Sequence, residues 1–289
     1  MEIVISNLSK NYGKKKALQD ISLSIPGGMY GLLGRNGAGK TSLMRILATL
    51  STQTGGEVTI NGVPLSDTKK VRGIVGYLPQ DFSMYPNMTV YGAMDYLGIL
   101  SEIRAQERKK RIDALLERVN LQDDWKTRVR ALSGGMRRRL GIAQALLHEP
   151  QVLIVDEPTA GLDPEERIRF RNLLCEFAEN RLVILSTHIV EDIETTCQNV
   201  AVLNKGTLLF SNTIDELIRQ ADGKVYTIEV PLNKQQEIKD KYTILSMQAG
   251  VSKMRCRILS DTPPAQAYTC EEATLEDGYM QLIKAHEGV

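Results

Sequence analysis

The sequence predicts an α/β fold, and three observations lead to that class. Apolar runs of strand length alternate with segments of helical periodicity over residues 29–200, which indicates a parallel sheet with crossover helices. A glycine-rich segment that ends in Lys-Thr joins the first of these strands to a helix. Near Gly223 the pattern changes to short alternating strands. We therefore expect a large α/β domain followed by a small α+β appendage.

Hydrophobic periodicity predicts the elements of the large domain. Ile21, Leu23 and Ile25 alternate with serines, as in a strand with one buried face, and Asn61-Gly62 favours a hairpin turn after a strand at 57–60. The segment before residue 147 is charged and helical in pattern. The other expected elements are buried strands at Met29–Leu33, Gln151–Asp156 and Leu182–Ser186 and helices at Thr41–Leu50 and Pro164–Glu179.

Capping patterns mark the C-terminal part of the chain. Thr213 and Glu216 match a capping box for a last helix of the large domain, and Thr274 and Asp277 match the start of a closing helix. Strands are expected between these two helices. We predict a large α/β domain over residues 1–222, with a helical subdomain at 83–147, and an α+β accessory domain over 223–289.

Composition limits the class of protein. The 289 residues carry a formal net charge of +1, so no global positive field draws the chain to nucleic acid. The four cysteines include no C-x-x-C pair, which argues against a zinc site and a disulfide scaffold and fits a reducing cytosol. We expect no signal peptide and no membrane-spanning segment, because no apolar stretch reaches about 20 residues.

A phosphate-binding loop is the first chemical motif. The segment Gly34-Arg-Asn-Gly37-Ala-Gly39-Lys40-Thr41 matches G-x-x-x-x-G-K-[ST]. In such a loop the backbone N–H groups cradle phosphates, the lysine neutralises their charge and the threonine hydroxyl is offered to Mg²⁺. The alternative is a glycine-rich turn with an incidental lysine. The flanking strand and helix argue against that alternative.

Three further segments carry candidate chemistry. Asp156 ends an apolar strand and Glu157 follows it, so this pair is suited to hold Mg²⁺ and to polarise a water molecule unless it is a solvent-facing turn. His188 follows another apolar strand, and a lone histidine there is more often structural than catalytic. Ser133-Gly134-Gly135 precedes a helix expected at Arg137–Leu147. This turn is either an anion site or an ordinary helix cap.

In this order, and with Gln80 in Tyr77-Leu-Pro-Gln80, the motifs resemble those of the ATP-binding cassette (ABC) family over residues 1 to 220. The resemblance implies a P-loop NTPase cassette with a mixed sheet core, an antiparallel β-subdomain and a helical subdomain. It implies that Glu157 is the catalytic base, that His188 contacts the γ-phosphate and that Gln80 touches Mg²⁺ and the attacking water. The implied metal ligands are Thr41, Gln80 and Asp156.

The resemblance also implies an ATP-contacting set. Tyr12 resembles the aromatic residue that stacks on adenine, and a buried core tyrosine is an equally favoured interpretation. Met136 and Arg138 stand where glutamine is frequent in the family. The Met136 change removes an amide that would make fine contacts and leaves the phosphate donors intact, whereas the Arg138 change has no evident consequence. The residues implied to bind ATP are Tyr12, Gly34, Asn36, Gly37, Ala38, Gly39, Lys40, Thr41, Ser42, Ser133, Gly134 and Gly135.

The implied function is that of an ATP-binding and ATP-hydrolysing transporter subunit on the cytoplasmic face of the membrane. It would dimerise head-to-tail, with itself or a paralogous cassette, around two MgATP, each Ser133 turn closing on the partner's ATP, and act on separate transmembrane permease subunits. The tail, including Thr274-Leu-Glu-Asp277, resembles the C-terminal extensions of exporter ATPases. An importer subunit and a soluble, non-transport ABC ATPase are the alternatives.

Overall fold

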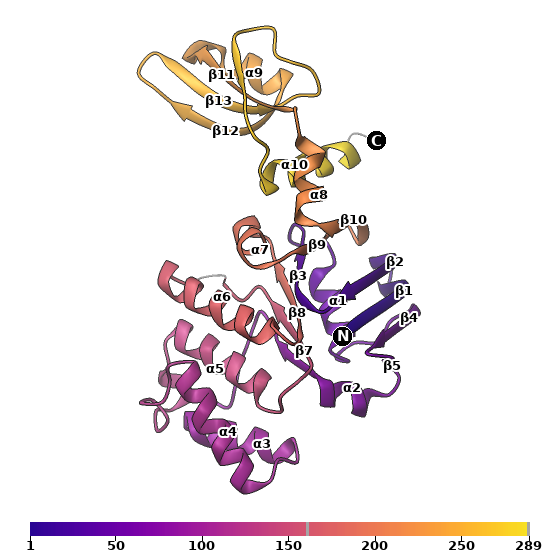
Figure 1. Cartoon of the computed structure of the whole chain (residues 1–289), viewed down its shortest axis with the longest axis vertical. Coiled ribbons are helices and arrows are strands. Elements are labelled where there is room, and N and C mark those ends of the chain that lie inside the picture. Colours follow the sequence, from indigo (N-terminus) through magenta and orange to yellow (C-terminus); the bar gives the residue numbers. More distant parts are fainter. Residues whose placement is uncertain (160–161, 288–289) are drawn as a thin grey trace. The chain divides into compact units, whose positions relative to one another are not determined.

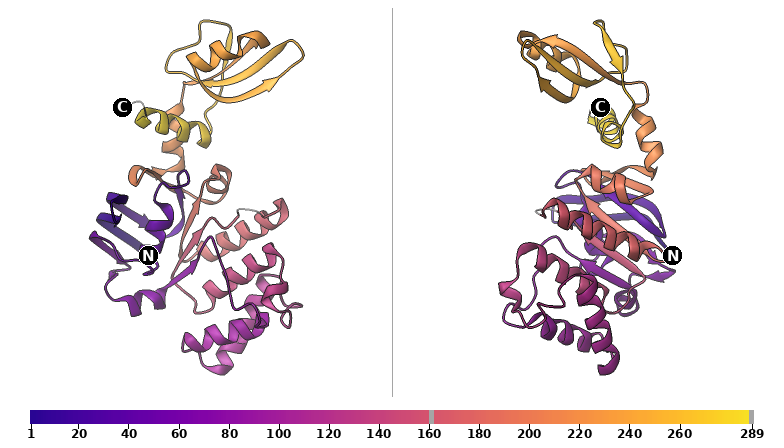
Figure 2. Two further views of the ribbon diagram at one scale, coloured as in Figure 1. Left: turned by 180° about the vertical axis from the view of Figure 1, so that it is seen from behind. Right: turned by 60° about the vertical axis from the view of Figure 1, so that its left-hand side comes forward.

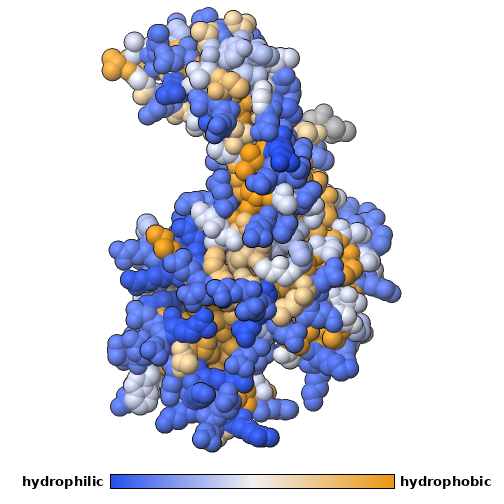
Figure 3. All heavy atoms as spheres, viewed as in Figure 1, coloured by the Kyte–Doolittle hydropathy of each residue, from blue (hydrophilic) through white to orange (hydrophobic). Residues whose placement is uncertain are grey.

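The computed structural model describes residues 1–159 and 162–287, and contacts divide the chain into two compact units, Met1–Ser211 and Asn212–Val289 (Figure 1). Hydrophilic residues cover most of the face seen in Figure 3. Within the described residues, none of the helices combines the length and the apolar character that crossing a bilayer requires.

The first unit is built on two sheets. The antiparallel sheet has the strand order β2-β1-β4-β5, from β1 (Glu2–Tyr12), β2 (Lys15–Pro26), β4 (Gly55–Ile60) and β5 (Val63–Pro64). The second sheet has the order β10-β9-β3-β8-β7-β6, from β3 (Gly28–Leu33), β6 (Val75–Leu78), β7 (Val152–Asp156), β8 (Leu182–Thr187), β9 (Asn199–Asn204) and β10 (Thr207–Thr213). The predicted hairpin is present, and Asn61 and Gly62 both have positive φ, as a type I′ turn requires.

One hydrophobic core joins the two sheets. Leu18 of β2, Met44 of α1 (Lys40–Leu47) and Ile154 of β7 are fully buried members of the same cluster. The helix α1 therefore lies between the antiparallel sheet and the parallel strands. The loop that precedes α1 is anchored by this packing.

Helices form the rest of the first unit. The predicted helical region contains α3 (Val90–Leu100), α4 (Ala105–Arg118), the short η1 (Val129–Ala131) and α5 (Gly134–Leu146), and α3, α4 and α5 lie side by side in Figures 1 and 2. The other helices are α2 (Thr68–Ile74), α6 (Pro164–Ala178) and α7 (Val190–Thr196). Asp163 caps α6, since its side chain accepts a hydrogen bond from the Glu166 N–H.

The register of the parallel strands brings three loops to one sheet edge. Leu33 of β3 pairs with Thr187 of β8, and Asp156 of β7 pairs with Ser186 of β8. All three strands run in the same direction, so the segments that follow them leave the sheet together. The P-loop, Glu157 and His188 are therefore neighbours.

The second unit is a small α+β fold. Its antiparallel sheet has the order β12-β13-β11-β14, from β11 (Val225–Pro231), β12 (Thr243–Ala249), β13 (Lys253–Leu259) and β14 (Tyr268–Cys270). Its helical elements are α8 (Ile214–Ile218), η2 (Arg219–Ala221), η3 (Leu232–Lys234), α9 (Gln235–Lys241) and α10 (Leu275–Glu287). Thr274 and Asp277 exchange the predicted capping hydrogen bonds at the start of α10. Asp277 also pairs with Arg257 of β13 at 2.5 Å.

The boundary between the units differs from the predicted one. Residues 212–222, including α8, were expected to close the large domain, whereas the contacts place them in the second unit. The reason is packing against α10: a Cβ added at Gly278 would lie 2.1 Å from the carbonyl oxygen of Leu217. The capping box of α8 predicted a helix correctly but carried no information about its packing partner.

We predict that Gly76→Ala destabilises the first unit. A Cβ on Gly76 of β6 would lie 2.2 Å from the Ala145 carbonyl oxygen of α5, so backbone must move, at a cost of about 1–3 kcal/mol. Urea unfolding followed by circular dichroism measures the loss. Gly73→Ala is the matched control, because a Cβ there meets nothing within 4 Å. Equal stability of the two variants would contradict the close approach of β6 and α5.

Candidate functional site

The P-loop owes its course to glycines. Gly37 and Gly39 have φ of 82° and 109°, which favours glycine. At Gly39 a Cβ would also lie 2.8 Å from the Ala17 carbonyl oxygen, so both backbone conformation and packing exclude a side chain. α1 begins at Lys40 directly after Gly39. Its N-terminal N–H groups and positive dipole end therefore face the loop, an arrangement suited to an anion.

A pocket of about 330 Å³ opens beside this loop, a volume in the range of small-ligand sites. It is lined by Tyr12, Lys15, Lys16, Ala17, Arg35, Asn36, Gly37, Ala38, Gly39, Lys40, Thr41, Ser42, Gln80 and Glu157. Gly34 is not among these lining residues; it turns the chain, and its carbonyl accepts a 2.5 Å hydrogen bond from Lys40 Nζ. The predicted P-loop, aromatic and Gln80 residues thus meet around one cavity.

Glu157 lies at the centre of the polar contacts. Its Oε1 is 3.2 Å from Lys40 Nζ and its Oε2 is 2.7 Å from His188 Nδ1. Lys40 and Glu157 are 5% and 4% exposed, whereas the His188 side chain is 48% exposed. The structure therefore brings the predicted lysine, carboxylate and histidine together and excludes the solvent-facing turn. The exposed imidazole leaves His188 accessible to a ligand.

Asp156 is a buried carboxylate suited to a cation. It is 0% exposed, and neither carboxylate oxygen accepts a hydrogen bond of normal geometry. Burial raises its pKa, an effect that the nearby hydroxyls of Thr41 and Ser186 oppose. Buried charge without a partner is costly, so the residues present fit Mg²⁺. No cluster of three or more His, Cys, Asp or Glu side chains surrounds a metal position in the described chain.

Tyr12 and Gln80, which the sequence supports least strongly, both lie at the pocket. Tyr12 is 46% exposed and lines the pocket, so the alternative of a buried core tyrosine is wrong. Lys10 Nζ lies 4.8 Å from the centre of its ring. Gln80 is exposed and also lines the pocket, together with Glu157.

The Ser133 turn lies elsewhere. The helix predicted at Arg137–Leu147 begins earlier, at Gly134, because the Ser133 hydroxyl accepts a 3.1 Å hydrogen bond from the Met136 N–H and caps it. Ser133, Gly134 and Gly135 are not among the described residues that line the P-loop pocket. A Cβ added at Gly134 would meet nothing within 4 Å. No contact within this chain therefore requires a glycine at position 134, in the first turn of α5.

Sequence reasoning gave no role to Arg138, which the structure places at the junction of the Gln80 and Glu157 loops. Its guanidinium donates only to backbone carbonyls there. Every residue has a carbonyl, so no side-chain pattern in the sequence could have indicated these partners.

Comparisons with known proteins identify the family of the chain. A family model described as ABC transporter matches residues 18–160. The Nod factor export ATP-binding protein I of Cupriavidus pinatubonensis is 33% identical over 297 residues, with 96% of this chain and 89% of that protein covered. An uncharacterized ABC transporter ATP-binding protein of Synechocystis is 37% identical over 214 residues, which are 73% of this chain. The chain spans 60% of the length of that second relative.

A solved structure supports the fold. The dimeric post-hydrolysis state of the ATP-binding cassette MJ0796, bound to ADP and Pi, aligns with a TM-score of 0.68 and 25% identity, over 73% of this chain and 98% of that one. The chain therefore belongs to the ABC transporter ATP-binding protein family and is an ABC-type ATPase. The expected fold and enzyme class are confirmed.

We predict that Lys40→Ala weakens ATP binding about ten- to a hundred-fold, because a charge-assisted hydrogen bond to phosphate contributes about 1.5–3 kcal/mol. Titration calorimetry of the purified chain with ATP measures the change. Lys109→Ala, on the exposed surface of α4, is the control and should bind as wild type. Unchanged affinity in the Lys40 variant would place the phosphates outside the P-loop.

Proposed function

We propose that the chain binds MgATP in the P-loop pocket and completes each catalytic site with the Ser133 turn of a second cassette. In this proposal Lys40 and the P-loop N–H groups hold the β- and γ-phosphates, Tyr12 stacks on adenine, and Thr41, Asp156 and Gln80 hold Mg²⁺. Glu157 is the general base and His188 contacts the γ-phosphate. The partner is a second copy of this chain or a paralogous cassette.

The Ser133 turn is the observation that carries the proposal. Its helix N-terminus offers N–H groups, and Gly134 leaves open space where a side chain would otherwise stand. The absence of a side chain at this position allows a phosphate to approach the backbone closely. Because the turn does not line its own P-loop pocket, the phosphate belongs to another subunit.

Hydrolysis in this site is a displacement at the γ-phosphorus. The oxygen of a water molecule forms a bond to phosphorus while the bond to the β–γ bridging oxygen breaks, and a water proton passes to Glu157. Mg²⁺, when bound, neutralises phosphate charge. Lys40, which lies 3.2 Å from Glu157, is placed to exchange this carboxylate for phosphate oxygens and leave it free for water. Positioning and charge stabilisation supply most of such catalysis.

The proposed process is export across the cytoplasmic membrane, with the chain docked on the cytoplasmic face of separate permease subunits. The relative that matches nearly the whole chain, tail included, has export in its name, and this supports an exporter over an importer. A soluble, non-transport cassette is the second alternative. An assembly with a membrane chain would exclude it.

A docking surface for the permease is proposed on the helical region. Residues 80–100 were expected to carry it on account of Phe82, Met84, Tyr85, Met88 and Tyr91. Of these, Tyr85 is exposed and packs edge-on against exposed Tyr96, with ring centres 5.2 Å apart. Ile99 and Leu100 are 52% and 60% exposed. Exposed apolar groups that lie together are typical of interaction sites.

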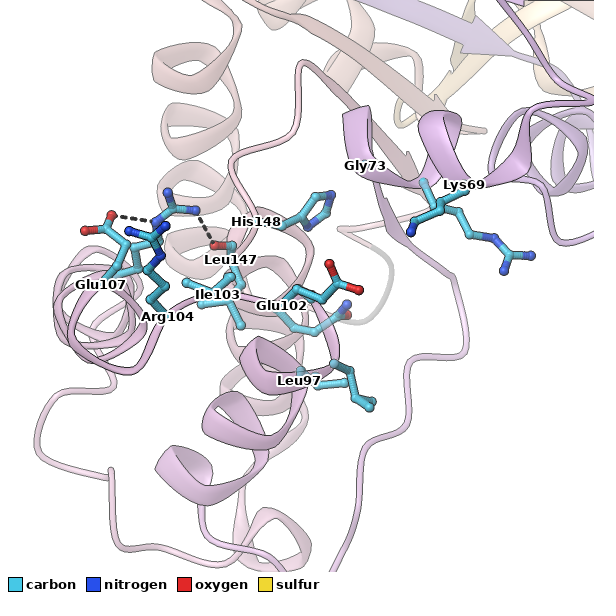
Figure 4. Close-up of a pocket in the computed structure, with 14 residues that line it drawn as sticks. Lys69, Gly73, Leu97, Glu102, Ile103, Arg104, Glu107, Leu147 and His148 are labelled. Carbon is cyan, nitrogen blue, oxygen red and sulfur yellow. Dashed lines mark hydrogen bonds and ion pairs between the residues drawn. The ribbon is translucent and has the colours of Figure 1, made fainter.

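A large pocket adjoins these residues and strengthens the proposal. It has a volume of about 810 Å³, and Figure 4 shows Lys69 and Gly73 of α2 on one side and Leu97, Glu102 and Ile103 on the other, with His148 between. Arg111 also lines this pocket and donates hydrogen bonds to the Glu107 carboxylate and to the Leu147 carbonyl. A helical segment of a permease with apolar and charged residues would fit its mixed lining.

Mixing two inactive variants tests the shared site. Lys40→Ala and Ser133→Arg homodimers are each expected to be inactive, since both of their sites carry a lesion. In the heterodimer both lesions fall in one site and the other site is whole. ATPase activity of the mixture should therefore recover to a fraction of wild type.

The control for this experiment is a mixture in which both lesions lie on the same chain, combined with wild type at the same ratio. Crosslinked heterodimers establish that the two chains associate. No recovery of activity in proven heterodimers would show that Ser133 does not complete the partner's site.

Crosslinking tests the docking surface. In assembled membranes, cysteines at Tyr85 or Leu100, in a chain whose exposed Cys270 is replaced by serine, should crosslink to a membrane protein. A cysteine at Val4, 39% exposed on β1, serves as the control and should not. Crosslinks from Val4 alone would move the docking surface to the antiparallel sheet.

A further inference from the structure

Arg138 makes an unusual set of contacts. It lies in the second turn of α5 and its side chain is half-buried. Nε donates to the Pro158 carbonyl at 3.0 Å, and Nη1 donates to the carbonyls of Pro79, at 3.1 Å, and Gln80. Nη2 donates to the carbonyls of Asp156, at 3.5 Å, and Glu157. The five N–H donors of a guanidinium thus match five carbonyls on two loops.

No other side chain can serve these carbonyls equally. An amide such as glutamine has two N–H donors, and a lysine has three donors on one atom without a planar fork. The two loops are also far apart in sequence from Arg138 and from each other, since Pro79 and Glu157 are separated from it by 59 and 19 residues. Arg138 therefore joins α5 to the Gln80 loop and to the Glu157 loop, which lie far from it and from each other in the sequence.

The contacts fix the backbone of a residue in an uncommon conformation. Glu157 has a φ of 49°, and non-glycine residues with positive φ persist where neighbouring groups hold them. Its N–H donates to the Ser186 carbonyl at 2.9 Å, and its own carbonyl accepts from Arg138. Both peptide groups are thereby held. This conformation carries the Glu157 carboxylate to Lys40 and His188.

The same guanidinium holds the second loop. Gln80 is anchored through its carbonyl while its side chain remains exposed in the P-loop pocket. A second cavity, of about 350 Å³, lies between this loop and the start of α5 and is lined by Gln80, Arg138 and Gly134 among others. Arg138 of α5 therefore links Gln80 to the helix that Ser133 caps.

We propose that Arg138 is a positioning residue for hydrolysis. Its guanidinium fixes the Glu157 and Gln80 backbones to α5, the helix that presents Ser133 to the second cassette. The inference rests on the proposed roles of Glu157 and Gln80 and adds a residue to which the motifs assign nothing. Burial lowers the pKa of the half-buried Arg138 guanidinium, an effect that the nearby carboxylates of Asp156, Asp81 and Glu157 oppose.

The test is a double-mutant cycle with Arg138→Met and Glu157→Gln in the full chain. Methionine keeps the unbranched stem and removes all donors. Arg138→Met should lower kcat about ten- to a hundred-fold, as small misplacements of catalytic groups do, with the ATP Kd and KM within about threefold of wild type. In the Glu157→Gln background the same change should lower the residual single-turnover rate by a smaller factor than in the wild-type background, because the part of its effect that passes through Glu157 is already lost.

Arg139→Met is the matched control. Arg139 is the next residue of α5 and donates to the carbonyls of Val119 and Asn120, at 2.9 and 2.7 Å, while pairing with Glu166. All of these contacts lie outside the P-loop pocket. Its loss should lower the thermal midpoint and leave kcat unchanged. Arg138→Lys, which keeps the charge without the planar fork, should stay at least about fivefold below wild type.

Three results would overturn the inference. Wild-type kcat in Arg138→Met, or in Arg138→Lys where the methionine variant does not fold, would show that the contacts are not needed. An equal loss in the wild-type and Glu157→Gln backgrounds would show that Arg138 does not act through Glu157. Wild-type hydrolysis by Glu157→Gln itself would remove Glu157 as the base. In that last case the proposed function fails first and the inference with it.

Discussion

Parallel pairing of β3, β8 and β7 is the constraint on which the site depends. The P-loop lies more than a hundred residues before Glu157 and His188 in the sequence, yet each of the three segments begins where one of these strands ends. Every residue of β7 and β8 is buried, so a shift of register by one residue would move each side chain to the opposite packed face of the sheet. The fully buried residues of these strands oppose such a shift. Packing of the core thus sets the geometry of the polar site.

The charged side chains of the site are buried, and they differ in whether a partner group lies beside them. Lys40, Asp156 and Glu157 are all buried, and ionised groups in such places need partners. Lys40 and Glu157 pair with each other, while the oxygens of Asp156 lack hydrogen bonds of normal geometry. Glu157 is thus paired within the protein, whereas the Asp156 carboxylate is available to a cation. It is consistent with the different roles proposed for the two adjacent acids.

The fold accounts for one of the two glycines expected at phosphate sites and not for the other. Gly39 is required by its φ and by the Ala17 carbonyl, so its explanation lies within the fold. Gly134 has neither a positive φ nor a neighbour that a Cβ would meet. The proposed approach of a second cassette's nucleotide to α5 would account for a glycine at this position.

The sequence by itself determined the local features: the P-loop, the strand ends at Asp156 and before His188, the hairpin at Asn61-Gly62 and the cap at Thr274. Each depends on residues within a few positions of one another, whose periodicity or side-chain chemistry is visible in the printed chain. Only the tertiary structure placed α8 with α10 and showed the five carbonyls around Arg138. Those contacts join distant segments through backbone atoms, and backbone atoms are the same at every position.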